Sequence, residues 1–187
     1  MRAVYWEWRP FRDPDRFWDW AMDPHADLDH DTDLDLHDVR FLDRLVAAAD
    51  RADCPHGEEC CHILEDFTPR LAVHGSPTDV VALRAAIARA ADGALPRVRR
   101  WAAYATRLLS YRGPVGRVNR ALAEQMAADL LSRPGHTPPA LLVETAANGR
   151  LWLCRSHTRF LYVSRRTGAW RLAAHSPLSD TDLRDLR

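Results

Sequence analysis

The chain has 187 residues and a formal net charge of zero, because 26 basic residues balance 26 acidic ones, and every basic residue is an arginine. The absence of lysine excludes Schiff-base chemistry, a P-loop phosphate site and the lysine of the common restriction-type nuclease core. A hydrophobic fraction of 47% and seven tryptophans are sufficient for a core, which excludes global disorder.

The N-terminal part is predicted to mix short elements with an acidic loop. Residues 3–9 alternate in polarity like a short strand. Asp13 followed by Pro14 is typical of a helix N-cap with proline at the first helical position. Residues 23–38 have no helical apolar face and are predicted to form a loop, and a helix is predicted over 38–52.

The middle of the chain is predicted to be helical after a loop at residues 53–62. Helices are expected near residues 62–68, 77–92, 96–112 and 116–132. Ser76 and Asp79 form a capping box for the second of these helices, and Pro96 opens the third.

The last part changes to the two-residue period of strands. Strands are expected at residues 140–146, 150–155, 159–164 and 169–174. Asn148-Gly149 is a strong hairpin signal between the first two, and Ser179 or Asp180 is suited to cap a short final helix. The predicted fold is α+β, with an α-rich N-terminal and middle part packed on a C-terminal four-stranded antiparallel β-meander with a short terminal helix.

The length fits a single domain over residues 1–187. Within it we distinguish an acidic part with cysteines and histidines (1–80), a basic helical part (81–135) and a basic β-meander part (136–187). The sequence has no apolar run of signal-peptide type and none near the roughly 18 residues of a membrane span. We therefore expect a cytoplasmic protein without a membrane partner.

The zero net charge conceals a division along the chain. Residues 1–80 carry 8 arginines and 19 acidic residues, whereas residues 81–187 carry 18 arginines and 7 acidic residues. Two stretches, 93–123 and 145–179, contain no acidic residue. This division indicates either that the acidic part neutralises the basic part or that the basic part meets an anionic partner.

Cysteine and histidine are concentrated in a pattern that is compatible with zinc. The candidate ligands are Cys54, His56, Cys60, Cys61, Cys154 and His157. Zinc takes four such ligands, commonly in close pairs, so a structural zinc is the one cofactor that the sequence suggests. No C-x2-C pair is present, and the alternative is that these cysteines are buried thiols that behave as small apolar residues.

The alternating aspartates of the acidic loop do not form a calcium site. If Asp27 and Asp38 were the first and last positions of an EF-hand loop, Thr32 would stand where the sharp turn requires glycine. The bidentate glutamate at the end is also missing. We therefore predict a solvated acidic loop, and the alternative is a loop that contacts the basic half or imitates a nucleic-acid backbone.

Arginine alternates with tyrosine along one line of the helix predicted at 96–112. The candidate residues for binding an anion or a nucleic acid are Arg100, Tyr104, Arg107 and Tyr111, with Arg165 and Arg166 on a hairpin tip. Such a line suits phosphate contacts combined with base stacking. The alternative is that the tyrosines border the core and the arginines are solvated.

These patterns favour a non-catalytic regulatory or accessory binding protein whose basic C-terminal half contacts a nucleic acid or an acidic protein surface. Two alternatives remain open: a protein-interaction module of inhibitor or immunity type, and a small metal-dependent hydrolase or nuclease. No nucleophile elbow, dinucleotide-binding or P-loop motif is present, so no catalytic residue is assigned.

Overall fold

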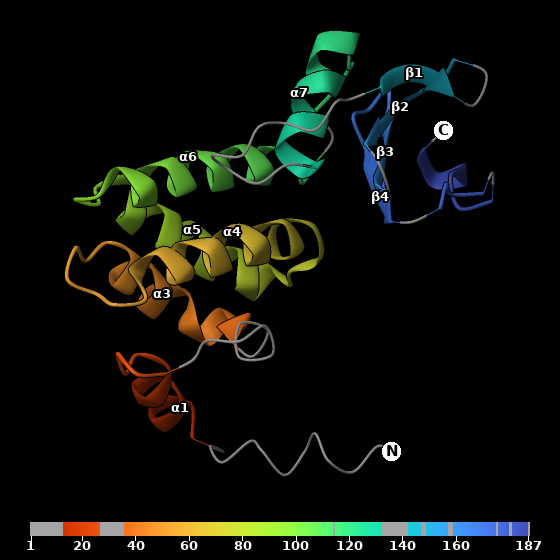
Figure 1. The fold of residues 1–187 in the computed structure, drawn as a ribbon. Coiled ribbons are helices and arrows are strands. Elements are labelled where there is room, and N and C mark those ends of the chain that lie inside the picture. The colour runs from red at the N-terminus through yellow and green to blue at the C-terminus, as the bar shows by residue number, and fades with distance from the viewer. Residues whose placement is uncertain are drawn as a thin grey trace, which may run out of the picture.

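The computed structural model describes residues 13–26, 36–113, 115–131, 142–146, 149–156, 159–174, 176–179 and 181–186. These residues form six α-helices followed by a four-stranded antiparallel sheet, which confirms the predicted α+β class. Most helices gather at one end of the molecule, and α7 stands between them and the sheet (Figure 1). In this part of the chain, no helix is long and apolar enough to cross a membrane.

The first helix, α1 (Pro14–Ala21), begins as predicted, because the Asp13 carboxylate accepts a hydrogen bond from the Asp15 N–H at 2.9 Å. A 3-10 turn (Val39–Phe41) leads into α3 (Leu42–Ala49), in place of one helix over 38–52. The predicted strand at residues 3–9 and the acidic residues 27–35 lie outside the described residues.

Helix α4 (Gly57–His74) corrects the prediction of a loop at 53–62 followed by a short helix near 62–68. The helix begins earlier and continues through Pro69, which lacks the backbone N–H that a helix interior normally uses. Tertiary contacts stabilise this second half. The buried Thr68 hydroxyl accepts a hydrogen bond from the Trp101 indole N–H at 2.9 Å, and Leu71 is buried in the core.

The other helices follow the predicted order. Helix α5 (Pro77–Ala91) has the predicted capping box of Ser76 and Asp79, and α6 (Pro96–Ser110) begins at its proline. Helix α7 (Arg120–Leu131) begins four residues later than predicted. The reason is that residues 115–118 run along a β-hairpin turn, where the N–H groups of Gly116 and Val118 donate to the carbonyls of Thr167 and Arg165.

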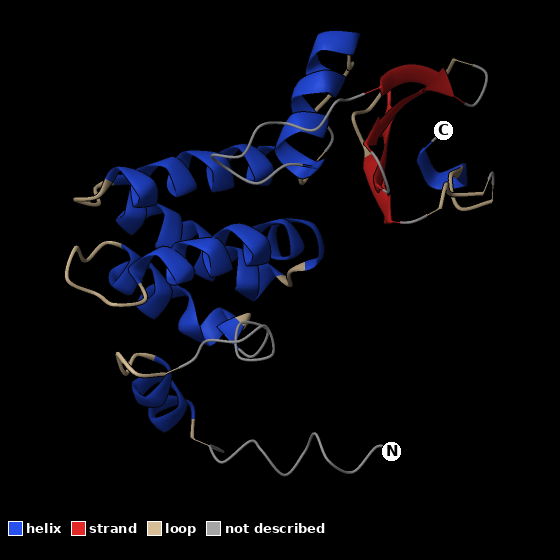
Figure 2. Cartoon of the chain, in the orientation of Figure 1, coloured by secondary structure: helices blue, strands red, loops and turns tan. Residues whose placement is uncertain are grey.

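The sheet consists of β1 (Leu142–Ala146), β2 (Leu151–Ser156), β3 (Arg159–Ser164) and β4 (Trp170–Ala174), in the order of a meander. This confirms the four predicted strands, and Figure 2 shows the sheet beside α7. One face packs on α7 and carries Cys154 and Leu161, and the other carries Phe160 and Tyr162.

The second sheet face is covered by residues that follow β4, among them Leu183 and Leu186. The predicted short terminal α-helix is absent from the described residues here, which contain only a 3-10 turn at Arg184–Leu186. Before this turn, the Ser179 hydroxyl accepts a hydrogen bond from the Asp182 N–H at 3.3 Å. The capping expected at Ser179 therefore supports a turn.

Candidate anion-binding site

The predicted arginine–tyrosine line on α6 is not an exposed surface. Tyr104 and Tyr111 are only 3% and 6% exposed, so the expectation that they are available for base stacking is wrong. Helix α6 contacts α4, α5 and α7, and its buried arc is wider than one apolar face. Burial raises the pKa of both phenols well above the ordinary value. The alternative of tyrosines packed at the core is therefore the correct one.

Arg107 holds α6 against α7. Its Nε lies 3.1 Å from Oδ1 of Asp129, and the Tyr111 hydroxyl donates to Oδ2 of the same carboxylate at 2.7 Å. The Asp129 side chain is only 8% exposed. Arg100 is exposed and forms no ion pair with another described residue. The four predicted positions on α6 therefore do not form one binding line.

Arg165 and Arg166 lie at the tip of the β3–β4 hairpin, as predicted. Together with three further arginines they surround an open hollow with a volume of about 1220 Å³. We call it the arginine hollow. It is lined by Arg117, Val118, Asn119, Arg120, Gly149, Arg150, Trp152, Ser164, Arg165 and Arg166.

Backbone hydrogen bonds fix the three segments that form the arginine hollow. The Arg165 N–H donates to the Arg150 carbonyl at 3.0 Å, and the Val118 N–H donates to the Arg165 carbonyl at 2.9 Å. Gly168 has a φ of +73°, and a Cβ there would collide with the Val115 side chain. Glycine is therefore required at position 168 for residues 115–118 to approach the β3–β4 hairpin so closely.

Trp152 lies beneath one of the arginines. Its half-buried indole donates to the Val118 carbonyl at 3.0 Å, which fixes the ring. The guanidinium carbon of Arg165 is 4.7 Å from the centre of this ring, and Nη1 of Arg165 donates to the Gly149 carbonyl at 2.7 Å. A cation over tryptophan is a favourable arrangement, so the Arg165 side chain is held in place by the ring and the Gly149 carbonyl.

The arginine hollow has a large excess of positive charge. Arg120 pairs with Glu124 at 2.8 Å, but no acidic residue is among the described residues that line the hollow. Arg117, Arg150 and Arg166 are exposed and form no ion pair with the described part of the chain. Helix α7 starts at the rim, where Asn119 caps it by accepting from the Leu122 N–H at 2.8 Å. Its positive end adds to the field.

The predicted zinc ligands are separated into two regions. Cys60 and Cys61 are buried on α4, and Cys54 is half-buried just before that helix. Cys154 is buried on β2, where its Sγ lies 3.6 Å from the Ala123 carbonyl of α7. Cys154 therefore fills the space between the sheet and α7.

The histidines do not complete a metal site within the described residues. Nε2 of His56 lies 2.8 Å from the Asp23 carbonyl oxygen, and His157 lies outside the described residues. The described residues contain no group of three or more histidine, cysteine, aspartate or glutamate side chains that could hold a metal ion. The structural zinc stays a prediction.

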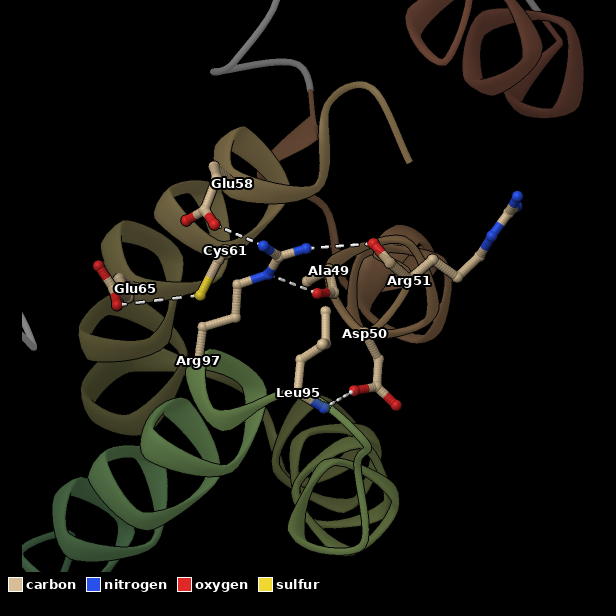
Figure 3. Close-up of polar contacts among 8 residues, drawn as sticks. All are labelled: Ala49, Asp50, Arg51, Glu58, Cys61, Glu65, Leu95 and Arg97. Atoms are coloured by element: carbon tan, nitrogen blue, oxygen red, sulfur yellow. Dashed lines mark hydrogen bonds and ion pairs between the residues drawn. The ribbon is translucent and has the colours of Figure 1, made fainter. Parts of the chain in front are cut away.

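Arg97 organises the segment that carries the first cysteines (Figure 3). Its Nε donates to the Ala49 carbonyl at 2.7 Å, its Nη2 donates to the Arg51 carbonyl at 3.1 Å, and its Nη1 pairs with Glu58. A Cβ at Gly57 would lie 2.6 Å from Nη2, so a larger residue at the start of α4 would displace the end of the Arg97 side chain. Sequence reasoning did not identify this role.

Within the described residues, acidic side chains neutralise the helical region of the basic part. Arg97 pairs with Glu58, and Arg89 of α5 pairs with Asp43 of α3, so helical arginines are matched by the acidic part. Arg107 is matched by Asp129. The arginine hollow has no comparable acidic neighbours among the described residues, apart from Glu124. The expected self-neutralisation therefore applies to the helical arginines, and an anionic partner for the arginine hollow stays a prediction.

Arg117, Arg120 and Arg150 are the members of the hollow that sequence reasoning did not select. They lie in the acid-free stretches 93–123 and 145–179, together with the two that it did select. The position of Arg150 directly after the predicted Asn148-Gly149 turn was a usable signal, because it places an arginine on a hairpin tip.

No family model, no curated protein and no solved structure matches this chain.

Proposed function

We propose that the protein is a non-catalytic regulatory or accessory binding protein, and that its basic C-terminal half contacts an anionic partner through the arginine hollow. One observation carries this proposal: five arginines from three chain segments surround a hollow that no acidic residue lines within the described structure.

The physical reason lies in the chemistry of the guanidinium group. Arginine presents donors in a planar fork that matches phosphate and carboxylate oxygens, and it stays charged at every physiological pH. Crowding such groups on one surface costs electrostatic free energy in the unbound protein. A bound polyanion removes that repulsion, so the arrangement favours association with a ligand that carries several negative charges.

The lining of the hollow supports binding rather than catalysis. It contains no cysteine, histidine, aspartate or glutamate among the described residues. Its one hydroxyl, on Ser164, is 1% exposed and accepts a hydrogen bond from the Thr167 N–H at 3.4 Å. The hollow therefore offers cations for recognition but no exposed nucleophile with an adjacent base.

Retention on a heparin column tests the proposal. The triple variant Arg117→Ala, Arg150→Ala, Arg166→Ala removes three exposed cations from the hollow. A matched control, Arg84→Ala, Arg100→Ala, Arg155→Ala, removes three exposed cations elsewhere. We expect the hollow variant to elute at clearly lower salt than wild type and the control to elute close to wild type, with circular dichroism showing that both fold.

Equal shifts for the two triple variants would show that net charge alone governs retention, and this would overturn the proposal. Absence of retention for the wild-type protein at low salt would overturn it as well.

A further inference from the structure

We infer that the anionic partner is a nucleic-acid strand, bound by its backbone phosphates independently of base sequence. This inference rests on the proposed function and specifies the ligand of the same hollow.

Among the residues that the structure describes, the arginine hollow has no exposed aromatic or aliphatic anchor at its centre. Protein–protein interfaces are organised around buried aromatic or aliphatic anchors, with charged residues depleted at the core. In the hollow, Val118 is 2% exposed and Trp152 is half-buried beneath Arg165. The described lining carries five arginines and no acidic residue, and such an excess of positive charge is typical of protein–nucleic acid interfaces.

A second feature of the arginine hollow is its number of cations and its size. Pockets that enclose small molecules usually measure about 300 to 1,000 Å³ and bury most of the ligand. The arginine hollow is larger, at about 1220 Å³, and open to solvent. A single phosphate needs only one or two arginines, whereas a nucleic-acid strand brings a negative charge with every nucleotide. Repeated cations in an open hollow therefore suit a repeated anion.

The side-chain groups that the arginine hollow leaves available are mainly hydrogen-bond donors. Reading all four bases requires both donors and acceptors, and arginine by itself reads only the two acceptors of guanine. Asn119 uses its side-chain oxygen to cap α7, the Trp152 N–H is bonded to the Val118 carbonyl, and Ser164 is buried. The guanidinium groups that remain present donors only, and phosphate oxygens are acceptors only. The hollow therefore matches the backbone of the strand.

Fluorescence anisotropy with a labelled single strand of about 20 nucleotides tests the inference on the full chain. We expect the hollow triple variant to bind at least about tenfold more weakly than wild type, and the matched control triple variant to stay within about twofold. Unlabelled strands of unrelated sequence should compete within about threefold of one another, because only the backbone is bound.

The competitors separate this inference from the proposed function. If polyglutamate displaces the strand as well as unlabelled strand does, or if the strand does not bind while heparin retention still depends on the hollow, the partner is an acidic protein and the inference is wrong. If inorganic phosphate at millimolar concentration displaces the strand completely, the hollow is a small-anion site and the inference is wrong. If the wild-type protein is also not retained on heparin at low salt, the proposed function itself is overturned.

Discussion

Asp129 has the environment of a buried structural carboxylate. The Arg107 guanidinium and the Tyr111 hydroxyl both donate to it across the boundary between α6 and α7. Asp129→Ala leaves that phenol buried without an acceptor, and we expect the free energy of unfolding to fall by about 2 kcal/mol. Denaturant titration measures this change, and Arg100→Ala on the exposed side of α6 is the control, expected within about 0.5 kcal/mol. Equal effects of both variants would contradict the account.

The cysteines differ in their access to solvent. Burial raises the pKa of Cys60 to about 12, of Cys61 to about 11 and of Cys154 to about 12, so these thiols stay protonated at neutral pH. Because the thiolate is the reactive form, we expect only the half-buried Cys54 to be alkylated rapidly in the native protein near pH 8. Mass spectrometry after timed alkylation measures this, and rapid modification of all four would contradict it.

Bound zinc would change that result, because metal ligation deprotonates a thiol. Elemental analysis of protein purified without a histidine tag decides whether the predicted structural zinc is present. A ratio near one zinc per chain supports it, and less than about 0.2 zinc per chain removes it.

The same groups predict how stability depends on alkaline pH. The folded-state pKa values of the three buried thiols lie above their ordinary value of 9.0, so their contribution to stability is complete below pH 9. It is lost as the pH rises through 9 towards 12, because the unfolded thiols then release protons that the folded ones retain.

The pKa of Tyr104 is also raised, so Tyr104→Phe should make the decline above pH 10 less steep. Denaturant titrations across this range measure the slope, and unchanged stability between pH 9 and 11 would contradict the prediction.

At the scale of elements, the C-terminal end of α4 depends on one side chain. Nη1 of Arg112 donates to the Ala72 carbonyl at 2.9 Å, and Nη2 donates to the Gly75 carbonyl at 2.6 Å. These carbonyls have no intrahelical partner at a helix end. We expect Arg112→Ala to lower the free energy of unfolding by about 1 to 2 kcal/mol and Arg84→Ala, on the exposed side of α5, to have almost no effect. A negligible effect of Arg112→Ala in thermal or denaturant unfolding would show that water serves these carbonyls equally well.

The elements that could be predicted are those with local signals. One such signal is the capping box at Ser76, which begins α5. Others are Gly149 and Gly168, which have positive φ in the turns of two hairpins. The helix and both hairpins were predicted because these signals act within a few residues. The continuation of α4 through Pro69 was not predicted. The contacts that stabilise this part of α4 come from Trp101 of α6 and from Arg112, which directly follows α6 and is distant in the sequence. The burial of Tyr104 likewise depends on how many helices surround α6.

At the scale of the whole molecule, the described arginines include those that pair with acidic residues and those of the arginine hollow, most of which do not. Arginines of α5 and α6 meet acidic residues of the N-terminal part, as in the Arg97–Glu58 pair. The hollow could be predicted only in part. The hairpin signal identified Arg165 and Arg166, but Arg117 joins them because residues 115–118 dock on the hairpin turn, a contact that sequence periodicity does not reveal.

The salt dependence of strand binding tests the arginine hollow most directly. Four arginines of the hollow form no ion pair with the described residues, and for a single strand each phosphate contact adds about 0.7 to the slope of log Kd against log salt concentration. We predict a slope of about 3 for the wild-type protein and about 1 for the Arg117→Ala, Arg150→Ala, Arg166→Ala variant, with the matched control unchanged. A slope that is the same in the hollow variant as in wild type would contradict the account.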